Sequence, residues 1–270
     1  MTEGAPVPIP GHAALLLPAR PGGGAEVAVS DLHIGLGYSG REGLGLAEAT
    51  SNSMAERLVR LAAEASATGV VVVGDLKHPI VGAPAPVGRL LFEFCSHLLS
   101  EGLAVSLILG NHDVGVARHL PREVSVLPAS GLRRGNVGLF HGHRWPTNSV
   151  LAAETLVCGH LHPGFRLAES GMPEGGKHGV WVRTQLAPSS SARKVRHRLR
   201  ARELIVLPAF NPLSGIEALN REAPAHYRSF LTHRFLARGR SRAYLLDGTD
   251  LGALPSWEEP RAPKRPSPAR

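Results

Sequence analysis

The sequence predicts an α/β fold, a four-layer αββα sandwich in which two mixed β-sheets pack face to face with helices outside. Two observations favour it. Between residues 27 and 109, short apolar runs alternate with helical patterns, which is typical of crossover units and a largely parallel sheet. Beyond residue 113, shorter strands and turns predominate, and they indicate a second, more antiparallel sheet packed against the first.

The predicted first sheet begins with a hairpin. Residues 13–17 are an apolar run, residues 21–24 contain a Pro-Gly turn, and residues 27–29 are the returning strand. The continuous apolar runs at residues 70–73 and 107–109 indicate strands that are buried on both faces.

Two helices are predicted between these strands. Apolar residues recur at helical spacing over residues 46–68 and again over residues 90–98. Gly69 and Gly102 follow the two patterns, and each is expected to end its helix as a C-terminal glycine.

The second sheet is predicted from shorter apolar runs at residues 124–127, 137–140, 156–158, 180–186, 203–207 and 243–246. We expect a single domain over residues 1–254. The remaining residues, 255–270, are rich in Pro, Arg and Glu and lack apolar periodicity, so they are expected to be a disordered basic tail.

Composition narrows the class of protein. The chain has 270 residues, a net charge of +8 and a pI near 10.3, which favours an anionic partner without specifying one. Two cysteines provide no disulfide framework, and a cytoplasmic location is expected. No apolar run approaches the roughly 20 residues of a membrane span, and a signal peptide is not expected.

Polar clusters follow five of the predicted strands. Because the carboxyl ends of strands present ligand groups in α/β sheets, these clusters are expected to form the functional site. The clusters are Asp31-Leu32-His33, Gly74-Asp75-Leu76-Lys77-His78, Gly110-Asn111-His112-Asp113, His141-Gly142-His143 and Gly159-His160-Leu161-His162.

The residue types in these clusters indicate metal binding. Carboxylate, imidazole and amide oxygen ligands suit Mn, Fe, Zn or Ni, and the scarcity of cysteine argues against a structural zinc site. Seven residues are candidate ligands, which fits two ions sharing a carboxylate better than one ion. They are Asp31, His33, Asp75, Asn111, His141, His160 and His162.

In this order, the five clusters resemble the motif set of the calcineurin-like metallophosphoesterases, over residues 31–162. The phrases His-Gly-His-Arg-Trp-Pro at 141–146 and Leu-Pro-Ala-Phe-Asn-Pro at 207–212 resemble a narrower branch, the archaeal relatives of the DNA-ligase-associated phosphoesterases. This second likeness extends the match to near residue 250.

The resemblance implies how the seven ligands are divided between two ions. The ligands of a first ion are Asp31, His33 and His162. The ligands of a second ion are Asn111, His141 and His160. Asp75 bridges both ions, and Mn is the favoured metal, with Fe, Zn or Ni as alternatives. His143 is an alternative to His141, which is preferred because it directly ends its strand.

The resemblance also implies a mechanism. Two divalent ions about 3.5 to 4 Å apart can present a hydroxide to phosphorus and neutralise the charge on the phosphoryl oxygens. His112 is expected to protonate the leaving oxygen as general acid, held by Asp113. The predicted function is a metal-dependent phosphoesterase acting on phosphodiesters, either nucleic acid or nucleotide. A nuclease is the candidate activity, and DNA repair is the candidate process. The alternatives are a small-molecule phosphomonoesterase and a non-catalytic metal-binding scaffold.

Flanking residues narrow the substrate. Protein phosphatases of this superfamily carry an arginine soon after the bridging aspartate, and residues 76–79 here contain none, which disfavours a protein phosphatase. Lys77 is expected to be a solvated surface residue or a phosphate contact. His78 resembles a phosphate-contacting histidine of the nuclease members and could equally be a supporting residue. Arg144 could clamp a phosphoryl oxygen or simply pack beside a Trp-Pro turn, and Asn211 could lie near the metals or only form a turn.

A basic stretch is the candidate nucleic-acid contact. It consists of Arg193, Lys194, Arg196, Arg198, Arg200 and Arg202. These cations could bind a phosphate backbone, although a solvated face explains them as well, and no aromatic residues are interleaved for base stacking. A repair protein such as a DNA ligase is a candidate partner by resemblance only. The sequence predicts no membrane contact.

Overall fold

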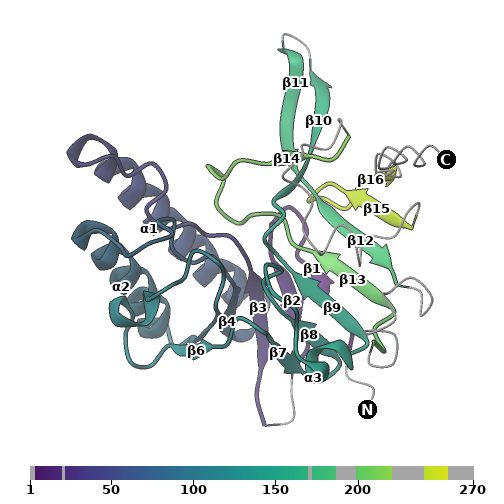
Figure 1. The fold of residues 1–270 in the computed structure, drawn as a ribbon, viewed down its shortest axis with the longest axis horizontal. Helices are drawn as coiled ribbons and strands as arrows, with labels where there is room; N and C mark the ends of the chain where they lie inside the picture. Colours follow the sequence, from purple (N-terminus) through teal and green to yellow (C-terminus); the bar gives the residue numbers. More distant parts are fainter. Residues whose placement is uncertain (1–3, 20–21, 170–171, 187–198, 221–239, 255–270) are drawn as a thin grey trace, which may run out of the picture.

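The computed structural model describes residues 4–19, 22–169, 172–186, 199–220 and 240–254. In this part of the chain two large sheets pack face to face, as the sequence predicts (Figure 1). The tail at 255–270 and four of the six basic residues, Arg193, Lys194, Arg196 and Arg198, lie outside the described residues.

The first sheet has six strands in chain order. They are β1 (Val7–Pro8), β2 (Leu15–Leu17), β3 (Ala25–Val29), β4 (Ala67–Val73), β5 (Ala104–Ile108) and β6 (Ser125–Leu127). The predicted hairpin is confirmed, because β2 pairs with β3 in antiparallel fashion. From β3 to β6 every pairing is parallel, so the carboxyl ends of these strands lie at one edge.

Two helices cover the outer face of the first sheet, α1 (Arg41–Glu64) and α2 (Ala85–Ser100) (Figure 1). Gly102 has a φ of +78° just after α2, as predicted. The prediction for Gly69 is wrong. The left-handed residue after α1 is Ser66, with a φ of +50°, and Gly69 lies within β4, where it pairs with Ala104.

The second sheet has seven strands, and its central strands β8, β9 and β13 are parallel. Their order across the sheet is β16 (Asp250–Ala253), β15 (Ser241–Tyr244), β12 (Trp181–Gln185), β13 (Glu203–Val206), β9 (Thr155–Cys158), β8 (Val137–Leu139) and β7 (Leu132–Arg134). The predicted strands at 137–140, 156–158, 180–186, 203–207 and 243–246 are confirmed here; the one predicted at 124–127 is β6 of the first sheet.

A small third sheet was not predicted. It consists of β10 (Pro163–Glu169), β11 (Met172–Gly179) and β14 (Glu217–Ala218), and its hairpin projects from the body of the molecule (Figure 1). Two short helices complete the described elements, the 3-10 turn η1 (Val116–His119) and α3 (Asn148–Leu151).

The central strands of both sheets are buried on both faces, and their side chains form the core. Val71 and Ile108 of the first sheet and Val157 and Ile205 of the second belong to one buried cluster between the sheets. The opposite face of the second sheet packs on α3 and on the base of the projecting hairpin at Phe165. No helix in the described part of the chain is long and apolar enough to cross a membrane.

Candidate metal centre

The five polar clusters converge at one edge of the sandwich. Asp31, Asp75 and Asn111 follow β3, β4 and β5 of the first sheet. His141 and His160 follow β8 and β9 of the second sheet. The two sheets are tied together there, because the backbone N–H of His160 donates to Asp31 Oδ2 at 3.0 Å. The site therefore needs both sheets.

Most of the ligand candidates have a strained backbone. Outside glycine, the structure describes six residues with positive φ, and five of them belong to the predicted ligand set. The five are Asp31 (58°), His33 (45°), Asp75 (54°), His160 (73°) and His162 (42°). This conformation costs of order 1–3 kcal/mol at a non-glycine residue and persists where the surrounding structure enforces it, commonly at functional sites.

Glycines beside the ligands permit this close approach. At Gly74, with a φ of +87°, a Cβ would lie 2.6 Å from the Cβ of His141. At Gly110 it would lie 2.9 Å from the carboxyl carbon of Asp75. No side chain fits between these loops, which explains why the sequence has glycine before both Asp75 and Asn111.

The first cluster is formed by Asp31, His33 and His162. Their candidate ligand atoms lie within 4.8 Å of one another. The Nε2 atoms of His33 and His162 are 3.2 Å apart, and His162 Nε2 is 3.2 Å from Asp31 Oδ1. The Asp31 side chain has no exposed surface, whereas that of His162 is 22% exposed. This is the set that the sequence assigned to the first ion.

The second cluster is formed by Asp75, His141 and His160, whose candidate atoms also lie within 4.8 Å of one another. His141 Nε2 is 3.2 Å from Asp75 Oδ2 and 3.2 Å from Asn111 Oδ1. The other ring nitrogen of His141, Nδ1, donates to the carbonyl of Val73 at 2.9 Å. Asn111 thus joins the set that the sequence assigned to the second ion.

Asp75 lies between the two clusters. Its Oδ2 is 3.2 Å from His141 Nε2 of the second cluster and 3.9 Å from His33 Nε2 of the first. Its Oδ1 accepts a hydrogen bond from the backbone N–H of His112 at 2.9 Å. A carboxylate in this position can serve both sites.

Burial and the nearby carboxylates set the pKa values of the histidines in this site. Burial alone would lower the pKa of His141, but Asp75 beside it raises that pKa to about 9. Burial dominates at His33 and His160 and lowers both pKa values to about 4. These two imidazoles are therefore neutral at pH 7, which is the form that binds a metal.

The residues fit divalent cations. Two imidazole nitrogens only 3.2 Å apart are aimed at one point beside a buried carboxylate, and the second cluster repeats the arrangement with an amide oxygen. Nitrogen and oxygen donors of this kind suit borderline divalent ions. Each ring fixed through a carbonyl, such as His141 on Val73, presents its other nitrogen to the centre.

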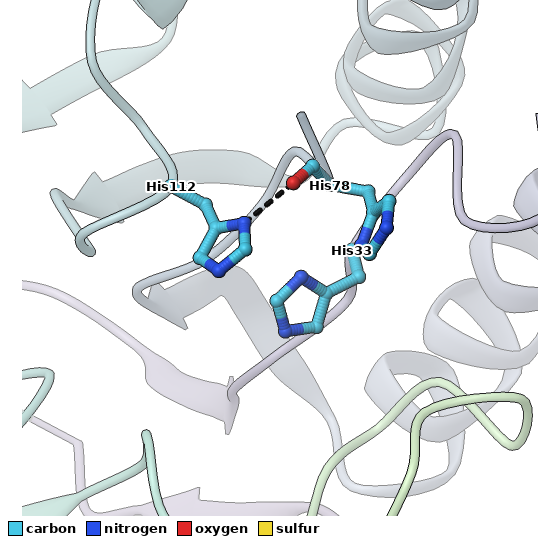
Figure 2. Close-up of side chains that lie close together, drawn as sticks. All are labelled: His33, His78 and His112. Carbon is cyan, nitrogen blue, oxygen red and sulfur yellow. Dashed lines mark hydrogen bonds between the residues drawn. The ribbon is translucent and has the colours of Figure 1, made fainter. Parts of the chain in front are cut away.

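His112 lies beside the first cluster. Its Nε2 is 3.9 Å from Asp75 Oδ2, and its ring centroid is 4.8 Å from that of His33. Figure 2 shows that the ring is held by the backbone of the neighbouring loop, because Nδ1 donates to the carbonyl of His78 at 2.5 Å. The expectation that Asp113 holds this ring is therefore corrected.

Asp113 instead holds the loops that carry the ligands. Its carboxylate accepts hydrogen bonds from the backbone N–H groups of Asp75 at 2.8 Å, Gly110 at 2.8 Å and Lys77 at 3.2 Å. It is 2% exposed. The turns after β4 and β5 leave these backbone N–H groups without strand partners, and the buried Asp113 carboxylate supplies the acceptors that they need.

Lys77 is a site residue that the sequence reasoning misjudged. It is fully buried, and its ammonium donates to the carbonyls of Pro79, Ile80 and His112. Burial lowers its pKa. Lys77 is thus neither solvated nor a phosphate contact; it ties the loop after β4 to His112. Its position inside a ligand motif was the available signal.

The remaining candidates lie at the margins of the centre. The His78 ring faces those of His33 and His112 (Figure 2), with its centroid 5.4 Å from that of His33. His141 Nε2 lies 3.2 Å from Asp75 Oδ2, and the His143 ring centroid lies 5.4 Å from that of His141. Arg144 is exposed on the adjoining loop.

Asn211 is a buried residue whose side chain is bonded to the backbone. It is 2% exposed, its Nδ2 donates to the carbonyl of Leu32 at 2.7 Å, and its Oδ1 accepts from the N–H of Leu213 at 2.9 Å. Both ends of its amide are engaged by backbone, and substrate binding by Asn211 stays a prediction. Asn211 nonetheless lies beside the candidate metal centre, because its partner Leu32 stands between the candidate ligands Asp31 and His33.

Comparison with known proteins supports the fold. The crystal structure of Pseudomonas putida nuclease MPE matches with a TM-score of 0.52 and 21% identity, covering 92% of this chain and 100% of that one. Yfce, a phosphoesterase from E. coli, matches with a TM-score of only 0.30 and 23% identity, over 53% of this chain and 74% of that one. No protein-family model and no curated sequence matches the chain. This chain shares the fold of the nuclease.

Proposed function

We propose that the protein is a dinuclear metal-dependent phosphoesterase. The observation that carries the proposal is the pair of ligand clusters on either side of Asp75, each with its candidate atoms within 4.8 Å. A carboxylate between two such sets is the arrangement by which two ions act on one phosphoryl group. The shared fold with a nuclease supports the same function.

The chain's own residues would bind the two ions, orient the substrate and protonate the leaving oxygen. When bound, two divalent ions supply an activated water and neutralise charge on the phosphoryl oxygens. Asp75 holds both sites in register, and His112 presents Nε2 toward the space above Asp75. The carbonyl of His78 keeps the Nδ1 proton of His112, so Nε2 is the nitrogen that exchanges a proton with the leaving oxygen.

We further propose phosphodiesters as the substrate class, with nucleic acid or a nucleotide ahead of monoesters. The net charge of +8, the fold shared with a nuclease and the likeness of motifs to the archaeal relatives of DNA-ligase-associated phosphoesterases support this choice. Mn is the proposed metal. Arg200 and Arg202, the described part of the basic stretch, precede β13 and lie at the end of that strand away from the centre. The free, buried thiols of Cys95 and Cys158 are compatible with a cytoplasmic location.

The test uses the full chain, stripped of metal and refilled with Mn²⁺. We expect hydrolysis of bis-p-nitrophenyl phosphate, faster than that of p-nitrophenyl phosphate, with cleavage of DNA or RNA as the decisive assay. The Asp75→Ala variant is the matched inactive control. Absence of metal-dependent turnover on both reporters would remove the enzyme proposal, and faster turnover of the monoester would favour the phosphomonoesterase.

A further inference from the structure

A segment of the second half of the chain crosses the first ligand cluster. Residues 210–217, which we name the strap, follow β13 and lead into β14. The strap lies far in sequence from the loop that carries Asp31 and His33, yet it contacts that loop and His162 through hydrogen bonds at both of its ends.

The first end of the strap holds the loop of Asp31 and His33. The N–H of Phe210 donates to the carbonyl of Ser30 at 2.9 Å. The side chain of Asn211 donates to the carbonyl of Leu32 at 2.7 Å. This loop has φ values of 58° at Asp31 and 45° at His33, so it needs external partners to keep both ligands turned inward.

The other end of the strap holds His162. The Nδ1 of this imidazole donates to the carbonyl of Gly215 at 3.0 Å, and the N–H of Glu217 donates to the carbonyl of His162 at 2.9 Å. The first bond fixes the proton on Nδ1, which leaves Nε2 as the ligand nitrogen, 3.2 Å from Asp31 Oδ1.

A residue of α1 secures the strap from outside. Arg57 donates from Nη2 to the carbonyl of Phe210 at 2.5 Å, and its guanidinium carbon lies 3.7 Å from the centroid of the Phe210 ring. The contact combines a charge-assisted hydrogen bond with a cation–π interaction. It joins the helical layer of the first sheet to the strap of the second.

We propose that the strap positions the ligands of the first ion alone, with Asn211 and Arg57 as its positioning residues. The inference rests on the proposed dinuclear centre. The second cluster is held differently, since His141 is fixed by the carbonyl of Val73 within β4. Weakening the strap should therefore lower the affinity of the first ion much more than that of the second, which is linked to the strap only through Asp75 and the hydrogen bond from His160 to Asp31.

The experiment is a calorimetric titration of the metal-free full-length protein with Mn²⁺. Two binding steps are expected in the unsubstituted protein. His162→Ala and His141→Ala identify the steps, because each removes a ligand of one cluster. Asn211→Ala should weaken the step that His162→Ala abolishes by about 10–100-fold, the usual effect of losing an outer-shell partner. Arg57→Met should weaken the same step, and it tests the strap without altering the ligand loops.

Asn220→Ala is the matched control. Asn220 makes the same kind of side-chain bonds, with Nδ2 donating to the Arg166 carbonyl at 2.7 Å and Oδ1 accepting from its N–H at 3.0 Å, but in the third sheet. It should leave both steps unchanged. Unaltered binding in Asn211→Ala and Arg57→Met, or equal weakening of both steps, would overturn the strap proposal. A wild-type protein that binds no Mn²⁺ would instead overturn the proposed function.

Discussion

The two halves of the metal centre are built from the same residue types but are supported differently. In the second cluster, His141 has no exposed surface, and its ring is fixed by a carbonyl of a central strand. In the first cluster, the His162 side chain is 22% exposed, and its ring is fixed by the strap. A ligand fixed by a core strand is as rigid as the sheet, whereas one fixed by a loop depends on every contact that keeps the loop in place.

Asp75 is where the two halves meet, and its removal has the largest expected effect. Asp75→Ala should lower the metal content from two ions toward none and reduce diester turnover by about 1,000-fold or more, since metal ions contribute several kcal/mol to the transition state. Metal content is measured by elemental analysis after dialysis. If one ion remains tightly bound, Asp75 belongs to a single half and does not bridge.

The proposed general acid, His112, lies on the side of the first cluster, because its ring contacts that of His33. His112→Asn should leave both Mn²⁺ steps in place and slow diesters with poor leaving groups by about 10²–10⁴-fold. Turnover of p-nitrophenyl esters should fall much less, because p-nitrophenolate leaves without a proton. Equal losses on both substrates would remove the acid role.

The difference in burial predicts unequal effects on stability. In the metal-free protein, His141→Ala leaves the buried Asp75 carboxylate without its 3.2 Å partner and should cost about 3–5 kcal/mol of the free energy of unfolding. His162→Ala likewise leaves the buried Asp31 carboxylate without its 3.2 Å partner, but water can enter at this 22% exposed position, so the cost should be smaller, about 1–3 kcal/mol. Urea unfolding at pH 7 measures both values. Equal costs would show that the two halves are equally rigid.

A further expected effect is a pH dependence to which both halves contribute, because burial alone would lower the pKa of each ring, but Asp75 raises the pKa of His141 and Asp31 raises that of His162. The pKa of His141 is about 9 in the folded chain and about 6.5 in an unfolded one. Between these values the folded state holds the extra proton, so the stability of the metal-free protein should fall as the pH rises. From pH 7 to 8.5 the contribution of His141 to this slope should be at most about 1.4 kcal/mol per pH unit.

The control for this slope is His141→Gln, which removes one of the two titrating imidazoles and should reduce the slope. Saturating Mn²⁺ should reverse the trend in the unsubstituted protein, because metal binding releases the same proton and becomes stronger at high pH. A rise in metal-free stability over this range would contradict the predicted pairing of His141 with Asp75.

The fold was predictable because its strands and helices leave short-range patterns of apolar residues in the sequence. Continuous apolar runs such as residues 70–73 mark strands buried on both faces, and the alternation with helices fixed the parallel order. The hairpin of β10 and β11 escaped prediction because it projects from the body and contains several glycines, so it lacks the apolar alternation by which strands are recognised.

That the candidate ligands lie together was predictable for the same reason, since each lies in the loop after a strand, whereas their division between two ions stays a prediction. The residues that hold the candidate ligands in place were not predictable. The roles of Asp113, Lys77 and Asn211 depend on backbone groups left unpaired by the turns, and a sequence does not show which carbonyl or N–H lacks a partner. Likewise, no residue type marks Gly215 as the acceptor for His162, because the contact uses only its carbonyl.

The hydrogen bond from Asn211 to Leu32 spans 179 residues of chain and has a consequence for the order of folding. All seven predicted ligands precede residue 163, so a nascent chain of that length already carries them. The first site is nevertheless secured only after β13 has paired with β9 and the strap has docked. Contacts of such long range form slowly and late. Metal capture at the first site would therefore report that the whole sandwich has closed.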